Sequence, residues 1–178
     1  MGALTAQAQE KRDMFNPEKT EVTSQTIAPD ARAGGMGDTG AATDPDVNSQ
    51  YWNPAKYPFT ISRAGVALNY TPWLRQLVND IDLAYLAGYY RIGDYSAVSA
   101  SLRYFSLGEV QASSSQSGNY DLTVNPYEMS VDVAYSLMLS ETFSIAAAVR
   151  WIYSDLKYDY TEDSKPGSAF ADDIAAYY

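Results

Sequence analysis

Six stretches of the sequence alternate apolar side chains with small or polar ones at a period of two. This period is typical of β-strands whose two faces meet different surroundings. The predicted strands span 60–70, 82–91, 96–106, 127–137, 143–154 and 168–178. Strands of about 9–11 residues with one apolar face and one polar face are what an outer-membrane barrel requires. The sequence therefore predicts an all-β protein, an antiparallel transmembrane β-barrel.

Each predicted inward face carries a charge whose sign changes from one stretch to the next. The six residues are Arg63, Asp82, Arg103, Asp132, Arg150 and Asp173. Opposite charges on neighbouring antiparallel strands can pair, so we predict a charge ladder along the lumen wall. This pattern favours a structural role for Glu128 and Asp132 over a catalytic carboxylate pair. It also assigns the alternate residues of the second stretch to the lipid-type face: Leu83, Tyr85, Ala87 and Tyr89.

The connections between the strands alternate in length. Residues 92–95 and 138–141 are short, whereas 71–79, 107–126 and 155–167 are long. Barrels of this class have short periplasmic turns and long extracellular loops. Six strands cannot close such a barrel, whose smallest members have eight, and an open edge is not viable in hydrocarbon. We therefore expect residues 58–178 to be the first strands of a larger barrel, with about half of its strands absent.

The segments before the strands lack this alternation. The run ALTAQA at 3–8 resembles the end of a secretory signal peptide, and Met1-Gly2 resembles an added start, so residues 1–8 are interpreted as a signal remnant. Residues 9–26 are polar and of mixed charge, which predicts a flexible periplasmic arm. Residues 27–57 are rich in Gly, Ala, Asp and Pro, which predicts a compact plug inside the lumen.

Composition excludes several functions. The 178 residues contain no Cys and no His, so no disulfide, thiol nucleophile or histidine general base is available. The net charge of −10 argues against nucleic acid as a partner. We predict no enzyme activity and no cofactor, metal or catalytic residues. The 16 tyrosines fit the interfacial girdles of a barrel.

Two short motifs have better structural explanations than functional ones. The run at 35–40 fits G-x-G-x-x-G, but Thr60 stands where a dinucleotide site needs an acidic residue. The run at 44–48 resembles the start of a calcium loop, but Ser49 and Ala55 replace its glycine and glutamate. Tight packing and Asx turns account for both.

The first long loop contains the candidate partner-binding residues. Trp73, Leu74 and Leu77 form an apolar group in a segment expected outside the membrane. An exposed apolar group of this kind indicates a partner surface. Folding of the same residues over the barrel mouth is an equally good explanation.

Several segments resemble a known family. APDARAGGMGD at 28–38 and YWNPAK at 51–56 resemble the start of fatty-acid-transporter-like outer-membrane barrels. NYTPWLR at 69–75, LAYLAGYY at 83–90 and SLRYFSLG at 101–108 resemble, more specifically, the outer-membrane shuttle components of type IX secretion. The similarity begins near residue 23 and runs to the end of the chain.

The resemblance implies a barrel of about fourteen strands in the outer membrane of a Gram-negative bacterium, with an N-terminal segment folded into its lumen. It implies a non-catalytic shuttle that binds the C-terminal signal domains of cargo at the translocon and delivers them to a sortase-like complex, which attaches cargo to lipopolysaccharide. Two alternatives remain. One is an outer-membrane transporter of fatty acids or other hydrophobic solutes, although the small, polar inward faces disfavour it. The other is a soluble carbohydrate-binding sandwich that uses Trp52, Trp73 and Trp151.

Overall fold

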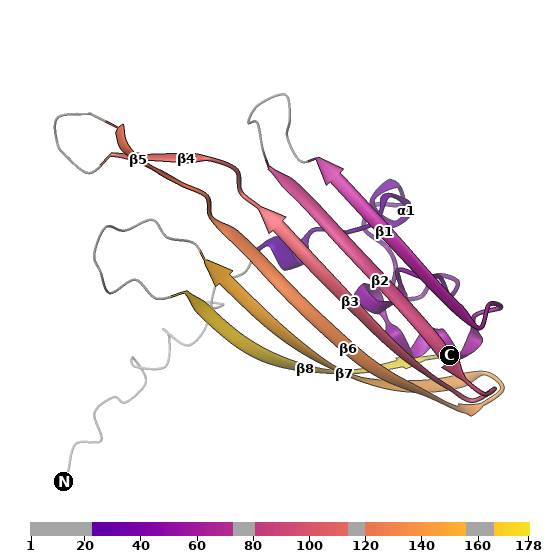
Figure 1. Ribbon diagram of the computed structural model, residues 1–178. Coiled ribbons are helices and arrows are strands. Elements are labelled where there is room, and N and C mark those ends of the chain that lie inside the picture. The colour runs from indigo at the N-terminus through magenta and orange to yellow at the C-terminus, as the bar shows by residue number, and fades with distance from the viewer. Residues whose placement is uncertain (1–22, 73–80, 114–119, 156–165) are drawn as a thin grey trace, which may run out of the picture.

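The computed structural model describes residues 23–72, 81–113, 120–155 and 166–178, and its main body is one antiparallel sheet (Figure 1). The six strands follow the order β1-β2-β3-β6-β7-β8, so the sheet is curved but not closed into a barrel. All six predicted strands are confirmed to within a few residues. Their bounds are β1 (Ala64–Pro72), β2 (Asp82–Ile92), β3 (Ser96–Ser106), β6 (Tyr127–Ser140), β7 (Phe143–Asp155) and β8 (Gly167–Tyr177).

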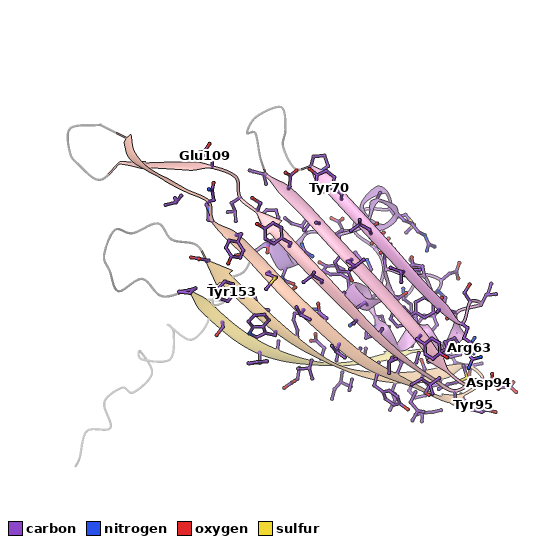
Figure 2. The ribbon with its side chains drawn as sticks, viewed as in Figure 1. Arg63, Tyr70, Asp94, Tyr95, Glu109 and Tyr153 are labelled. Atoms are coloured by element: carbon purple, nitrogen blue, oxygen red, sulfur yellow. The ribbon has the colours of Figure 1, made fainter. Side chains whose placement is uncertain are left out.

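The strand ends that border the short connections lie at one end of the sheet, and the strand ends that border the long connections lie at the opposite end (Figure 1). At the end with the short connections, called the turn end, stand Arg63, Asp94 and Tyr95, whereas Tyr70 and Tyr153 stand toward the other, loop end (Figure 2). The predicted separation of short and long connections is therefore confirmed. Within the described ranges, no helix is long and apolar enough to cross a membrane.

The connection between β3 and β6 is more ordered than predicted. It contains a second, two-stranded sheet, in which β4 (Val110–Ser113) pairs with β5 (Tyr120–Val124). The sequence of β5 is YDLTV, which alternates large apolar residues with polar ones. That period of two is the same signal that marked the longer strands. The long connection predicted over 107–126 is therefore present, and it contains two short strands that were not predicted.

Four short helical elements lie against the concave face of the sheet (Figure 1). The α1 helix begins where the side chain of Asp30 accepts a hydrogen bond from the Ala33 amide at 2.8 Å. The η3 helix begins in the same way, because the side chain of Asn53 accepts from the Ala55 amide at 3.0 Å. The elements are η2 (Thr23–Thr26), α1 (Ala31–Gly35), α2 (Ser49–Trp52) and η3 (Pro54–Phe59), and together with their connections (residues 23–60) we call them the plug.

The inward and outward faces agree with the alternation predicted for every strand except β2. There, Leu83, Tyr85, Ala87 and Tyr89 are buried under the plug, and the lipid-type assignment of these four is wrong. The error has a simple cause: the opposite face of β2 is also apolar, with Leu86 and Tyr90 exposed, so hydrophobicity does not distinguish the two faces. Contacts with aromatic residues of the plug determine which face of β2 points inward.

A glycine on β1 makes room for one of these contacts. Gly65 pairs with Tyr89, and a Cβ atom at Gly65 would stand 2.7 Å from the Tyr89 ring and 2.9 Å from Val47. The Tyr89 ring therefore lies over Gly65, which has no side chain, and packs with Tyr57 and Ala97 in a buried cluster. This cluster is the core of the interface between plug and sheet at the turn end.

Candidate functional site: the concave face and its plug

The inner face of β6 and β7 binds the plug through serine hydroxyls. Ser136 donates to the Pro54 carbonyl at 2.7 Å, and Ser144 donates to the Ala55 carbonyl. Both serines and both plug residues are buried. The small polar side chains of the inward faces therefore serve as donors to the plug backbone.

The amide of Asn53 continues this attachment to the last strand. Its Nδ2 donates to the carbonyl of Ala176 in β8 at 2.9 Å and lies 3.3 Å from the carbonyl of Ala41. The same side chain caps η3 through its oxygen. One buried asparagine thus caps the start of η3 and connects it to β8, the last strand of the sheet.

Arg103 of β3 holds the beginning of the plug. Its Nη2 donates to the carbonyls of Ser24 and Ile27, the latter at 2.9 Å, and its guanidinium carbon lies 5.4 Å from the centroid of the Tyr51 ring. The side chain is 1% exposed. Burial also raises the pKa of Tyr51 above its ordinary value. Arg103 is therefore a cation bound by neutral carbonyls and an aromatic face.

The predicted charge ladder is only partly present. Arg150 binds Asp132 and lies 3.9 Å from Asp173, so these three residues connect β6, β7 and β8 on the inner face. Ser101 donates to the second oxygen of Asp132 at 3.1 Å. Arg103, however, pairs with Tyr85 of β2 and Ser130 of β6, and among the described residues it forms no ion pair with a carboxylate. Its predicted pairing with a neighbouring carboxylate is wrong.

The first two members of the ladder lie elsewhere. Asp82 is on the outer face of β2, because the inward face of that strand is the opposite one, and it accepts a hydrogen bond from the Tyr70 hydroxyl at 2.7 Å. Arg63 precedes β1 at the turn end, with its guanidinium carbon 5.7 Å from the Tyr90 ring centroid. Their assignment to the inner face is corrected accordingly.

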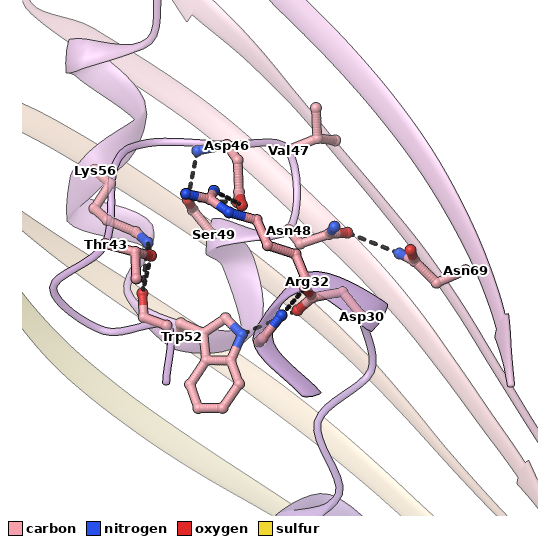
Figure 3. A network of polar contacts seen from close by, with 12 residues as sticks. Asp30, Arg32, Thr43, Asp46, Val47, Asn48, Ser49, Trp52, Lys56 and Asn69 are labelled. Atoms are coloured by element: carbon pink, nitrogen blue, oxygen red, sulfur yellow. Dashed lines mark hydrogen bonds and ion pairs between the residues drawn. The ribbon is translucent and has the colours of Figure 1, made fainter. Parts of the chain in front are cut away.

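Polar contacts also hold the plug together internally (Figure 3). Arg32 pairs with Asp46 at 2.9 Å, and Trp52 donates its indole N–H to Asp30 at 3.1 Å. Both motifs singled out in the sequence lie here. Asp46 also accepts from Ser49, and a Cβ atom at Gly40 would stand 2.3 Å from the Trp52 ring. Asp46, from the run at 44–48, and Gly40, from the run at 35–40, therefore both have structural roles within the plug.

Lys56 is the buried cation of the plug. Its Nζ donates to the Gly40 carbonyl at 2.6 Å and to the Thr43 hydroxyl at 3.2 Å, and the residue is fully buried. Burial lowers the pKa of Lys56 below its ordinary value. The lysine therefore organises the plug's loop through hydrogen bonds to neutral groups.

The outer face carries a row of aromatic rings at the loop end. Successive centroids are 5.7 Å apart from Tyr104 to Tyr127, 5.9 Å from Tyr127 to Tyr153 and 6.0 Å from Tyr153 to Trp151. Trp151 is one member of this row, whereas Trp52 is bound within the plug. The sugar platform considered for these tryptophans is not assembled by the described residues.

Some predicted residues lie outside the described part of the chain. These are residues 1–8, most of the arm at 9–26, and the candidate contact residues Trp73, Leu74 and Leu77. The last four residues of the predicted arm form η2. Sequence reasoning also missed Asp172, which the alternation of β8 places on the outer face beside Phe170 and Ile174.

A family model described as type IX secretion system protein PorV matches residues 7–178. No curated protein matches the sequence.

Proposed function

Since the chain belongs to the PorV family of type IX secretion proteins, we propose that it forms the first strands of a non-catalytic outer-membrane barrel that carries secreted proteins to the cell surface. The single observation that carries this proposal is the family match, which spans 7–178. The apolar outer face and its aromatic row are what a lipid-facing wall and an interfacial girdle require. The location in the outer membrane follows from the same reasoning.

The open sheet supports completion into a barrel. Its edge strands, β1 and β8, each have a hydrogen-bonded neighbour on one side only among the described strands. Unpaired backbone groups are too costly in hydrocarbon. We propose that further strands close the wall into a barrel of about fourteen, the size that the family resemblance implies.

The filled concave face argues that cargo does not pass through the lumen. Buried serines, Asn53 and Arg103 fix the plug by its backbone. A transporter of fatty acids would instead need an apolar cavity inside the wall. We propose that cargo binds at the loop end, through its C-terminal signal domain, and that Trp73, Leu74 and Leu77 contribute to that contact.

The proposed cycle involves three partners. The barrel receives cargo at the type IX translocon, carries it within the outer membrane, and delivers it to a sortase-like complex that cuts the signal domain and attaches the cargo to lipopolysaccharide. No step in this cycle requires a bond to be made or broken by this chain, which agrees with a family of secretion components.

Deletion of the gene in its native host tests the proposal. We expect proteins with type IX C-terminal signals to accumulate uncut in the periplasm, and the gene supplied in trans to restore them to the surface. Uptake of a labelled long-chain fatty acid should be unchanged. Normal surface display of these proteins together with reduced fatty-acid uptake would make the protein a solute transporter.

A further inference from the structure

The outer face has an apolar hollow over β1, β2, β3 and β6. Its volume is about 450 Å³. The outer-face residues that line it are Val66, Leu86, Gly88, Ala100, Leu102 and Val131. The floor is formed by β2 and β3, each of which has a hydrogen-bonded neighbour on both sides. The hollow is therefore a feature of the interior of the sheet, whatever strands complete the wall.

The hollow forms where two small residues stand opposite each other. Gly88 of β2 pairs with Ala100 of β3. Larger pairs flank them on the same face: Leu86 with Leu102 toward the loop end, and Tyr90 with Val98 toward the turn end. On the side of β1, Gly88 pairs with Val66, which is 78% exposed. The small pair thus lies at the bottom of a depression with an apolar rim.

The packing of the wall does not require a glycine at position 88. A Cβ atom there would lie 3.4 Å from the Gly65 carbonyl oxygen and 3.5 Å from the Val66 side chain, which are ordinary contacts. Gly88 also lacks the positive φ that favours glycine. A glycine inside a strand weakens the strand, and it often marks a place where a ligand approaches the backbone closely. The missing side chain therefore indicates an occupant of the hollow.

A cation lies between the hollow and the turn end. The guanidinium carbon of Arg63 is 5.7 Å from the ring centroid of Tyr90, which follows Gly88 by two residues on the same face of β2. Two residues of a strand span about 7 Å. Arg63 is exposed and stands at the turn end (Figure 2). From the turn end toward the middle of the sheet, the outer face thus presents a cation, a tyrosine ring and an apolar hollow.

A membrane phospholipid carries complementary groups in the same order. Its phosphate can bind Arg63, because a guanidinium group donates two parallel hydrogen bonds to phosphate oxygens. One of its acyl chains can then lie in the hollow. A flat protein surface would instead rest on the exposed rim at Val66 and leave the floor at Gly88 uncovered, whereas a single flexible hydrocarbon chain can enter the depression.

We propose that this hollow binds one acyl chain of a membrane phospholipid whose phosphate group is bound by Arg63. The inference rests on the proposed function, because it requires the outer face to lie in the membrane. Since the short turns of such barrels lie on the periplasmic side, the phospholipid belongs to the periplasmic leaflet. The chain fills the space that Gly88 and Ala100 leave in the wall.

Native mass spectrometry of the intact protein, extracted from outer membranes and stripped of lipid, tests the proposal. The probe is palmitoyl-oleoyl phosphatidylglycerol, added at increasing concentrations. We expect Ala100→Leu, which fills the hollow, to bind the first lipid at least about tenfold more weakly than the parent, because about two methylene groups of the chain lose their burial. Gly88→Leu should have the same effect. Ala147→Leu makes the matched change on the outer face of β7, away from the hollow, and should bind as the parent does.

The role of the phosphate is tested separately. We expect Arg63→Gln to weaken binding of the same probe at least about tenfold, because hydrogen bonds to a charged group are lost. A diacylglycerol with the same chains, which has no phosphate, should bind the parent equally weakly. Equal binding of the two lipids by the parent would overturn the proposal.

The variants also separate this inference from the proposed function. The Ala100 side chain already points out of the wall and is exposed, so Ala100→Leu should keep the heat-modified migration of the parent barrel on gels. Equal lipid binding by folded Ala100→Leu and Ala147→Leu would overturn the inference alone. Failure of the parent protein to fractionate with outer membranes would instead refute the proposed function.

Discussion

Tyr57 of η3 and Tyr89 of β2 stack with their ring centroids 4.7 Å apart and their planes inclined by 24°. The Tyr57 hydroxyl donates to the Val47 carbonyl at 2.9 Å, and Tyr57 is fully buried. Offset stacking of this kind adds to the burial of the two rings. This pair joins the plug to the wall at the turn end, and it explains why β2 presents tyrosines inward.

Truncation of Tyr57 tests how much its contacts with Tyr89 and Val47 contribute to the stability of the protein. We expect Tyr57→Ala to lower the free energy of unfolding of the intact protein in micelles by about 3 kcal/mol, as for other buried aromatic residues. Tyr57→Phe keeps the stack and loses one hydrogen bond, so it should cost about 1 kcal/mol. Urea titration measures both, with Tyr95→Ala, 68% exposed in a turn, as the control. Equal costs for the two Tyr57 variants would contradict this account.

Alanine substitutions at two glycines should change the stability of the protein in opposite directions. Gly65→Ala would place a methyl group 2.7 Å from the Tyr89 ring, and we expect it to destabilise the protein by about 1–3 kcal/mol. Gly34→Ala meets nothing within 4 Å inside α1. It should stabilise the protein by about 0.5–1 kcal/mol because alanine favours helix. Chemical denaturation of the two variants side by side checks the contrast.

Arg103 should control the exposure of the first part of the plug. Because the described chain has no cysteine, Gln25→Cys provides a single labelling site beside Ser130. Arg103→Met removes two charged hydrogen bonds to Ser24 and Ile27. We expect maleimide to label the cysteine at least about tenfold faster, since each such bond contributes about 1.5–3 kcal/mol. In the control Arg32→Met, which breaks only the Asp46 pair within the plug, the labelling rate should not change.

The lowered pKa of Lys56 predicts how the stability of the protein depends on pH. Its pKa is lowered in the folded protein, so between that value and the ordinary 10.5 the unfolded chain binds more protons than the folded one. Stability should therefore rise with pH across this window and level off above it. We expect the parent to gain stability relative to Lys56→Met as pH rises. Burial also raises the pKa of Tyr57, but that effect is common to both proteins and cancels in the difference. A difference independent of pH would show that Lys56 is not desolvated.

The contact role proposed for the first long loop can be tested directly. We expect Trp73→Ser combined with Leu77→Ser to reduce capture of a purified C-terminal signal domain by the intact barrel at least about tenfold, as for central apolar contact residues. The heat-modified migration of the barrel on gels should be unaffected. Capture at the parent level would exclude these residues from the contact.

Strand positions could be predicted from the sequence because the period of two is a local property. The face of β2 could not, since both of its faces are apolar and only the position of Tyr57 and Tyr51 in the plug decides between them. The same limit applies to Arg103. Alternating charge indicated an ion pair, whereas the structure supplies backbone carbonyls from a segment 76 and 79 positions away. The alternation of β8 also predicts that Asp172 lies on the outer face, but the predicted ladder included only the inward charges.

The attachment of the plug has a consequence for the order of assembly. The plug precedes every strand in the sequence, yet its bonds from Ser136, Ser144 and Ala176 join residues 82, 89 and 123 positions apart. Synthesis therefore delivers the plug first, and its full set of bonds becomes available only after β8 has joined the sheet. Until then, the buried amide of Asn53 needs another partner, such as water or a chaperone. A chain that lacks β8 should therefore lose the bond of Asn53 to Ala176 while it keeps the bonds that Ser136 and Ser144 make to the plug.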